Sequence, residues 1–164
     1  MKKILQFLPV AVLFISMTGC EKKDDQRLFD DLTATVTPSS GAATAFKATG
    51  VDDQEEPNLS SYPGTYRVQL TANGANNEYI TISFVFPDAV PATFNITTPL
   101  SESNAICAYH KPGATSDEVG VSGSITATGY DQNPFNSSEH KITGTFDFTT
   151  SSGTHVTGDF QCIL

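Results

Sequence analysis

The amino-acid sequence predicts an all-β domain, a single antiparallel β-sandwich or flattened barrel of about eight or nine strands. Three observations support this fold class. Apolar and polar residues alternate with a period of two along much of the chain, as half-buried strands require. Segments rich in Gly, Pro, Asn and Ser separate the alternating runs, and threonine, which suits a pleated sheet, is abundant. After residue 20 no periodicity predicts a helix longer than one or two turns.

The strands are expected at regular intervals along the chain. A stretch of small residues holds the first two, which we place at residues 32–37 and 43–49. Each later run puts its apolar side chains on one face, so each has a buried and a solvated side. These runs are residues 66–71, 80–86, 94–96, 142–148 and 156–164, and turn-like segments lie at residues 38–41, 73–77, 87–88 and 151–153.

The last hairpin is predicted to be the centre of the core. Ile142, Phe146 and Phe148 share one face of their strand. Burying one such Phe side chain contributes roughly 1.5–3 kcal/mol. Gly144 lies on the same face, where it leaves room for an aromatic ring from the neighbouring strand.

The N-terminus has the order of parts found in a bacterial lipoprotein signal. Lys2 and Lys3 are followed by an apolar run over residues 4–15 and by small or polar residues that end at Gly19-Cys20. The apolar run is too short to span a bilayer comfortably. We therefore divide the chain into a signal peptide (residues 1–19), a charged flexible tether (20–31) and a β-sandwich domain (32–164), with a signal helix over about residues 3–18.

The charge of the chain restricts its partners. Cleavage before Cys20 removes two lysines and none of the 18 acidic residues, so the formal charge falls from −9 to −11. A protein this acidic is repelled by the phosphate backbones of nucleic acids and by anionic lipid. The charge therefore excludes nucleic acid as a partner. We therefore expect the membrane to be reached through acyl chains, such as palmitate, on Cys20.

The tether suggests where the lipoprotein resides. Its start, Glu21-Lys22-Lys23-Asp24-Asp25, resembles the lysine-then-acidic export signal of Bacteroidota surface lipoproteins. The resemblance implies an outer-membrane protein anchored on the cell surface. The alternative is a solvated spacer on a lipoprotein that faces the periplasm.

Two further cysteines, Cys107 and Cys162, form a candidate disulfide. An even pair in an exported protein permits such a bond, and Cys162 shares the inward parity of Phe160. The two cysteines lie too far apart in sequence for a CxxC redox or zinc site. The alternative is two buried thiols that behave as small apolar residues.

Few residues indicate catalysis or metal binding. His110, His140 and His155 have no partner at a metal-ligand spacing, so we predict no metal and no cofactor. The acidic run at residues 52–56 lacks the alternation that wraps Ca²⁺, and we interpret it as a solvated loop. No Gly-x-Ser-x-Gly elbow is present, and the acidic residues fall in expected loops or on outward strand positions. We predict no enzymatic activity.

Aromatic residues provide the best candidate for recognition. Tyr130 and Phe135 lie in the longest loop expected after residue 120, where they could stack on a sugar or an apolar ligand. The absence of Trp weakens the glycan-binding interpretation.

The C-terminal third resembles an uncharacterised Bacteroidota lipoprotein family, known as a domain of unknown function. In that family a Gly-x-Ile-Thr strand, an Ile-x-Gly-x-Phe-x-Phe strand and a terminal Gly-x-Phe strand follow one another. The corresponding residues here are Gly123 to Thr126, Ile142 to Phe148 and Gly158-Asp159-Phe160. The resemblance implies a compact all-β domain in the cell envelope and no known activity. The cysteine pair departs from the family pattern.

Together these observations predict a lipid-anchored lipoprotein of the outer membrane or cell surface. Its domain is expected to be a non-enzymatic binding or structural module whose partner, a glycan or an envelope protein, is unknown. The alternative is a surface accessory protein that binds glycans or small molecules. A hydrolytic enzyme is the third interpretation.

Overall fold

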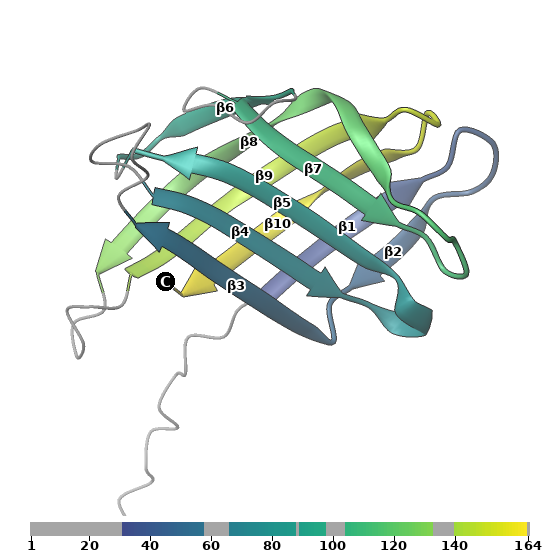
Figure 1. The fold of residues 1–164 in the computed structure, drawn as a ribbon, viewed down its shortest axis with the longest axis horizontal. Helices are drawn as coiled ribbons and strands as arrows, with labels where there is room; N and C mark the ends of the chain where they lie inside the picture. The colour runs from purple at the N-terminus through teal and green to yellow at the C-terminus, as the bar shows by residue number, and fades with distance from the viewer. Residues whose placement is uncertain (1–30, 58–65, 88, 98–103, 133–139, 164) are drawn as a thin grey trace, which may run out of the picture.

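The computed structural model describes residues 31–57, 66–87, 89–97, 104–132 and 140–163, which form an all-β fold, as predicted (Figure 1). The expected signal helix, Cys20 and nearly all of the tether lie outside these ranges. In chain order the elements are β1 (Asp31–Thr37), β2 (Thr44–Lys47), β3 (Gly50–Pro57), β4 (Tyr66–Asn73), the 3-10 helix η1 (Ala75–Asn77), β5 (Tyr79–Phe86), β6 (Ala92–Ile96), β7 (Asn104–His110), β8 (Glu118–Gln132), β9 (His140–Thr150) and β10 (His155–Ile163). Within the described residues, no helix has the length and apolar character needed to cross a bilayer.

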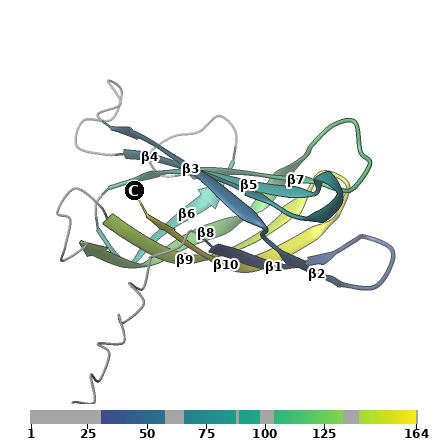
Figure 2. The same cartoon turned by 90° about the horizontal axis from the view of Figure 1, so that it is seen from below.

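The strands form one ten-stranded sheet in the order β2-β1-β10-β9-β8-β6-β7-β5-β4-β3. The sheet curls into a half-barrel with two layers: β3, β4, β5 and β7 lie over β1, β8, β9 and β10 (Figures 1 and 2). It is mixed rather than wholly antiparallel, because β6 runs parallel to β7 at two register pairs, Asn95 with Asn104 and Ile96 with Ala105. The remaining pairings described are antiparallel.

The acidic run at residues 52–56 is part of strand β3, so its interpretation as a loop is wrong. β3 is the last strand in the order of the described sheet, where it pairs with β4. Charged residues are common on such edge strands, where they discourage pairing with other chains. The lack of apolar alternation therefore reflects an edge position.

The two edge strands of the sheet, β2 and β3, are consecutive in the chain. Only Ala48 and Thr49 separate them, and their backbone N–H groups donate to opposite layers. The Ala48 amide donates to the Leu32 carbonyl of β1 (3.1 Å), whereas the Thr49 amide donates to the Asn73 carbonyl of β4 (2.7 Å). Residues 44–57 thus form one bent strand that crosses between the layers at a corner, as in orthogonal β-sandwiches.

The core lies between the two layers and is built from the inward face of every strand. The predicted inward positions Val68, Leu70, Ile142, Phe146 and Phe148 are all buried, which confirms the alternating pattern. Aromatic rings make up much of this core: the ring centroid of Phe84 is 5.2 Å from that of Phe94 and 5.9 Å from that of Phe160.

Gly144 accommodates a neighbouring aromatic ring, as the sequence predicted. Its position pairs with Phe160 of β10, and a Cβ placed on Gly144 would lie 2.6 Å from that ring. The Cβ would also lie 2.4 Å from the Thr126 carbonyl oxygen, so the neighbouring backbone and the Phe160 ring together require glycine at this position.

The predicted disulfide between Cys107 and Cys162 is wrong. Both thiols are buried and are not bonded to each other. Cys107 on β7 pairs with Ile82 of β5, whereas Cys162 on β10 pairs with Ile142 of β9, and β9, β8 and β6 separate β10 from β7 in the sheet. Inward parity was correct for Cys162, but parity does not establish which strands are neighbours. Burial raises the pKa of the Cys107 thiol, so it remains protonated.

The two ends of the half-barrel differ in the connections and strand termini that they carry. Four connections, at residues 38–43, 74–78, 111–117 and 151–154, lie at one end, which we call the turn end (right in Figure 1). The chain enters β1 at Asp31 and leaves β10 at Ile163 at the opposite end, which we call the entry end.

Candidate functional site

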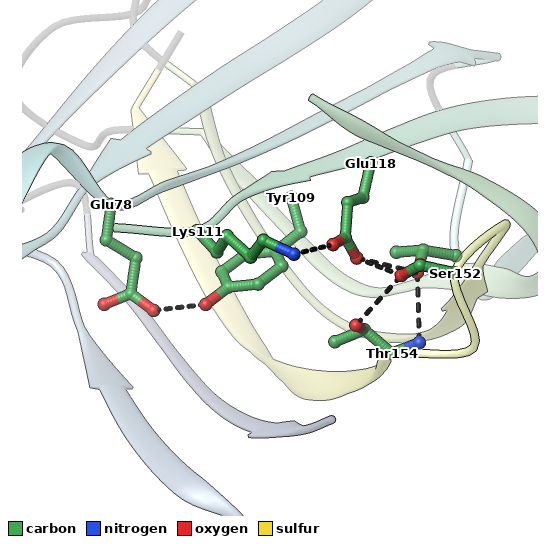
Figure 3. Close-up of polar contacts among 7 residues, drawn as sticks. Glu78, Tyr109, Lys111, Glu118, Ser152 and Thr154 are labelled. Atoms are coloured by element: carbon green, nitrogen blue, oxygen red, sulfur yellow. Dashed lines mark hydrogen bonds and ion pairs between the residues drawn. The ribbon is translucent and has the colours of Figure 1, made fainter. Parts of the chain in front are cut away.

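The turn end gathers a set of polar contacts that we call the turn-end cluster (Figure 3). It takes residues from three connections that are distant in sequence but adjacent in the sheet. The members are Glu78, Tyr109, Lys111, Glu118, Thr150, Ser152 and Thr154.

The β9–β10 turn supplies the hydroxyl groups of the cluster. The Thr150 amide donates to the Thr154 carbonyl (2.8 Å), and the Thr154 amide donates to Thr150 Oγ1 (3.1 Å), which closes the turn. Gly153 has φ +84°, a left-handed conformation that favours glycine. This geometry turns Thr150, Ser152 and Thr154 toward one another, with Ser152 Oγ 3.0 Å from Thr150 Oγ1 and 3.2 Å from Thr154 Oγ1.

The carboxylate of Glu118 is the centre of the cluster. It accepts hydrogen bonds from Lys111 Nζ (3.0 Å), from Thr150 Oγ1 (3.1 Å) and from Ser152 Oγ. Its side chain is only 12% exposed. Strand register brings these groups together, because Glu118 pairs with Tyr109 of β7 while Gly120, two residues further on, pairs with Thr150 of β9.

The cluster holds Glu118 in its ionised form. Burial by itself raises the pKa of the carboxyl group. Hydrogen bonds from Ser152, Lys111, Thr154 and Thr150 more than offset this effect and bring the pKa to about 2. A carboxylate with so low a pKa is a poor general base toward Ser152, since an effective general base has a pKa near the working pH.

A second carboxylate of the cluster binds a buried tyrosine. Tyr109 is 5% exposed, and its hydroxyl donates to Glu78 Oε1 (2.7 Å). Burial, followed by the hydrogen bond to Glu78, raises the pKa of Tyr109, so the phenol remains a protonated donor. Glu78 follows η1, and its hydrogen bond ties the β4–β5 connection to β7.

Beside the cluster, two aromatic rings and an aspartate form a third contact. Tyr79 and His110 are register partners, and their rings stack with centroids 4.6 Å apart and planes inclined by 5°. Asp117 Oδ1 accepts the Tyr79 hydroxyl (2.5 Å) and lies 2.8 Å from His110 Nδ1. The hydrogen bonds from Tyr79 and His110 lower the pKa of Asp117. The contact fixes the β7–β8 connection over the sheet.

The predicted ligand loop is placed differently by the structure. Tyr130 belongs to strand β8 and not to a loop. A β-bulge between Ala127 and Gly129 shifts the alternation of β8, so Tyr130 turns toward the core. Its ring packs against Phe86 (5.3 Å between centroids) and stacks on His140 (5.1 Å), whose Nδ1 forms a hydrogen bond with the Tyr130 hydroxyl. The placement of Tyr130 in a loop is therefore wrong. Phe135 lies outside the described residues.

Each histidine contacts a side chain from a neighbouring segment. His110 contacts Asp117, His140 contacts Tyr130, and His155 Nε2 lies 2.9 Å from Asp147 Oδ1. Among the residues that the structure describes, no group of three or more His, Cys, Asp or Glu side chains is arranged to hold a metal ion.

Sequence reasoning missed the turn-end cluster altogether. Glu118 follows a loop and has no motif around it, and Ser152 was interpreted only as part of the turn at residues 151–153. The sequence did contain an acidic residue at the start of a strand and, elsewhere, a turn rich in hydroxyl groups. Only the strand order shows that these two features are adjacent.

Comparison with protein-family models, with curated proteins and with solved structures gives no match for this chain. Its function must therefore be argued from the chemistry of its own residues.

Proposed function

We propose that this protein is a lipid-anchored lipoprotein of the bacterial outer membrane whose β domain is a non-enzymatic binding or structural module. The anchor rests on the signal segment that ends at Gly19-Cys20. Cell-surface exposure rests on the tether sequence, and the periplasmic face is the alternative.

The geometry of the entry end supports attachment through Cys20. Asp31 begins β1 at this end, and Cys20 precedes it by 11 residues. An extended segment of that length reaches at most about 40 Å. An acyl chain on Cys20 would therefore keep the entry end within that distance of the membrane.

The state of Glu118 is the observation that carries the non-enzymatic part of the proposal. The best-organised polar cluster among the described residues uses its central carboxylate to accept hydrogen bonds, with a pKa of about 2. Hydrolytic catalysis needs a nucleophile beside a base that exchanges protons near the working pH. The cluster instead joins β7, β8 and the β9–β10 turn, which is a structural task.

Metabolic labelling tests the anchor directly. Cells expressing the full chain and fed a radiolabelled or alkyne-bearing palmitate should incorporate label into the wild type and none into Cys20→Ser, because acylation requires that thiol. Ser16→Ala, inside the signal segment, is the matched control and should label like the wild type. Equal label in Cys20→Ser would contradict the proposal.

Enzyme assays test the second part. The full-length protein should show no turnover above buffer on panels of glycoside, ester and peptide substrates. Turnover that disappears on replacement of a single acidic or histidine residue would overturn the non-enzymatic assignment.

A further inference from the structure

The outer side of one layer carries an array of short hydroxylated side chains. The layer consists of β1, β10, β9 and β8, and lies lowest in Figure 2. We call its outward side the hydroxyl face, defined by Thr33, Thr35, Thr37, Ser122, Ser124, Thr126, Thr143, Thr145, Thr149 and Thr157.

Strand register aligns these residues into rows that cross the sheet. One row runs Thr33, Asp159, Thr145, Thr126, and the next runs Thr35, Thr157, Asp147, Ser124. Neighbouring strands lie about 4.8 Å apart, and alternate residues along a strand about 6.7 Å apart. The two rows therefore present hydroxyl and carboxylate groups on a regular grid.

A shallow depression of about 300 Å³ lies at the centre of this grid. Its rim is formed by Ser124 of β8, Thr145 and Asp147 of β9, and Thr157 and Asp159 of β10. Both rows contribute to it, and the volume is at the lower end of the range for small-molecule sites. The depression is open to solvent on a sheet surface, so it suits one side of an extended chain better than an enclosed ligand.

The side chains of the hydroxyl face are suited to binding because they are short and stiff. Threonine is β-branched and has a restricted χ1, so its hydroxyl is already oriented. Ordering a long flexible side chain on binding costs conformational entropy, and the short threonines largely avoid that cost. The outward side of the other layer also carries hydroxyl groups, on Thr71 and Thr81, but beside the longer Gln54, Arg67 and Gln69 and the apolar Ile106.

The carboxylates of the depression select against an anionic ligand. Asp147 contacts His155 through one oxygen, and the exposed Asp159 carries a second negative charge on the neighbouring strand. Carboxylate oxygens form strong, short bonds with O–H donors. The ligand should therefore present many hydroxyl groups and carry no negative charge.

We propose that the depression on the hydroxyl face, centred on Thr145, Asp147, Thr157 and Asp159, is a binding site for a neutral polysaccharide chain lying across β8–β10. This inference rests on the proposed function as a binding module and specifies its ligand class. The sugar hydroxyls donate to Asp147 and Asp159 and exchange hydrogen bonds with the threonine and serine hydroxyls. The threonine methyl groups pack against the C–H surfaces of the rings.

Affinity electrophoresis of the full-length acylated protein in detergent tests the proposal. Native gels contain an α-glucan, a β-glucan, a mannan or a xylan as neutral chains, or polygalacturonate as an anionic chain, and the retardation gives a dissociation constant. At least one neutral chain should retard the wild type, and polygalacturonate should not. Asp159→Asn should weaken retention by at least about fivefold, and Ser124→Lys, which places a long side chain in the depression, by at least about tenfold.

Matched controls lie on the opposite layer. Asp52→Asn and Gln54→Lys make the same charge changes on β3 and should leave the dissociation constant within about twofold. If Ser124→Lys does not fold, Asp159→Asn decides the outcome, because its side chain is exposed.

Three results would overturn the inference: no retention by any neutral chain, retention unchanged in Asp159→Asn, or binding of an octalysine peptide in place of the neutral chains. The last result would identify a basic-peptide surface. Assays for new reducing ends in the same samples separate this inference from the proposed function. Cleavage of the retained chain would overturn the non-enzymatic assignment, while retention sensitive to Asp159→Asn would still support the binding site.

Discussion

The two ends of the half-barrel are held together by different kinds of interaction. At the turn end, Glu118, Glu78 and Asp117 accept hydrogen bonds from side chains on neighbouring connections. At the entry end, the ring of Tyr130 packs between Phe86 and His140. One end thus depends on ionised carboxylates and the other on aromatic contact area.

The two ends therefore contribute to the stability of the domain through different interactions. Apolar contact is insensitive to pH over the range in which carboxyl groups titrate, whereas a carboxylate acceptor is lost once it is protonated. Substitutions at the two ends should therefore differ in size and in pH dependence.

The largest effect is expected at the entry end. Tyr130→Ala removes a ring that contacts two other rings, and we expect a loss of about 3 kcal/mol in the free energy of unfolding, measured by urea denaturation. Tyr130→Phe, the control, keeps the ring and should lose at most about 1 kcal/mol, because it removes only the hydroxyl bonded to His140. Equal losses in the two variants would show that the hydroxyl, and not the ring, stabilises this end.

A smaller loss is expected at the turn end. Glu118→Ala leaves the buried hydroxyl of Thr150, which is 2% exposed, without its carboxylate acceptor. We expect a loss of about 2 kcal/mol in the free energy of unfolding. Asp159→Asn, at an exposed position of β10, serves as the control and should change it by less than about 0.5 kcal/mol. A Glu118→Ala variant as stable as the control would remove the structural role assigned to the cluster.

The smallest effect is the dependence of stability on pH that arises from the carboxylates of the turn end. The pKa of Glu118 is about 2 in the folded protein and ordinarily 4.5, so its contribution is complete above about pH 5 and falls as the pH drops toward 2. The lowered pKa of Asp117 acts in the same direction. The free energy of unfolding should be measured at pH 6 and at pH 3. Its decrease between the two pH values should be larger in the wild type than in Glu118→Gln, by an amount on the order of 1 kcal/mol. Tyr130→Ala should show the same decrease in the free energy of unfolding between pH 6 and pH 3 as the wild type. A smaller decrease in this variant would contradict the assignment of the pH dependence to the turn end.

Sequence alone predicted the fold class and the faces of the strands, because alternation directly reports which side of a strand is buried. The strand expected at residues 32–37 is β1, and Gly144 makes room for Phe160 as expected. β3 was missed because an edge strand of acidic residues carries no alternation. The disulfide was predicted wrongly because parity gives a face and not a neighbour, and Cys107 lies on a strand several positions from β10.

The turn-end cluster could not be predicted for the same reason. Glu118 and Ser152 are separated by 34 residues and meet only because β7, β8 and β9 are adjacent with a particular register. Tyr130 was assigned to a loop because the bulge between Ala127 and Gly129 interrupts the alternation of β8, while the strand continues to Gln132.

The pairing of the first strand with the last has a consequence for how the protein is made. β1 forms its ladder with β10 along its whole length, from Asp31 with Gln161 to Thr37 with His155. A chain that is synthesised N-terminus first cannot complete this ladder until the residues of β10 are also available. Contacts this distant in sequence also slow folding. The topology thus makes completion of the fold depend on the last strand, β10, which must pair with the first strand, β1.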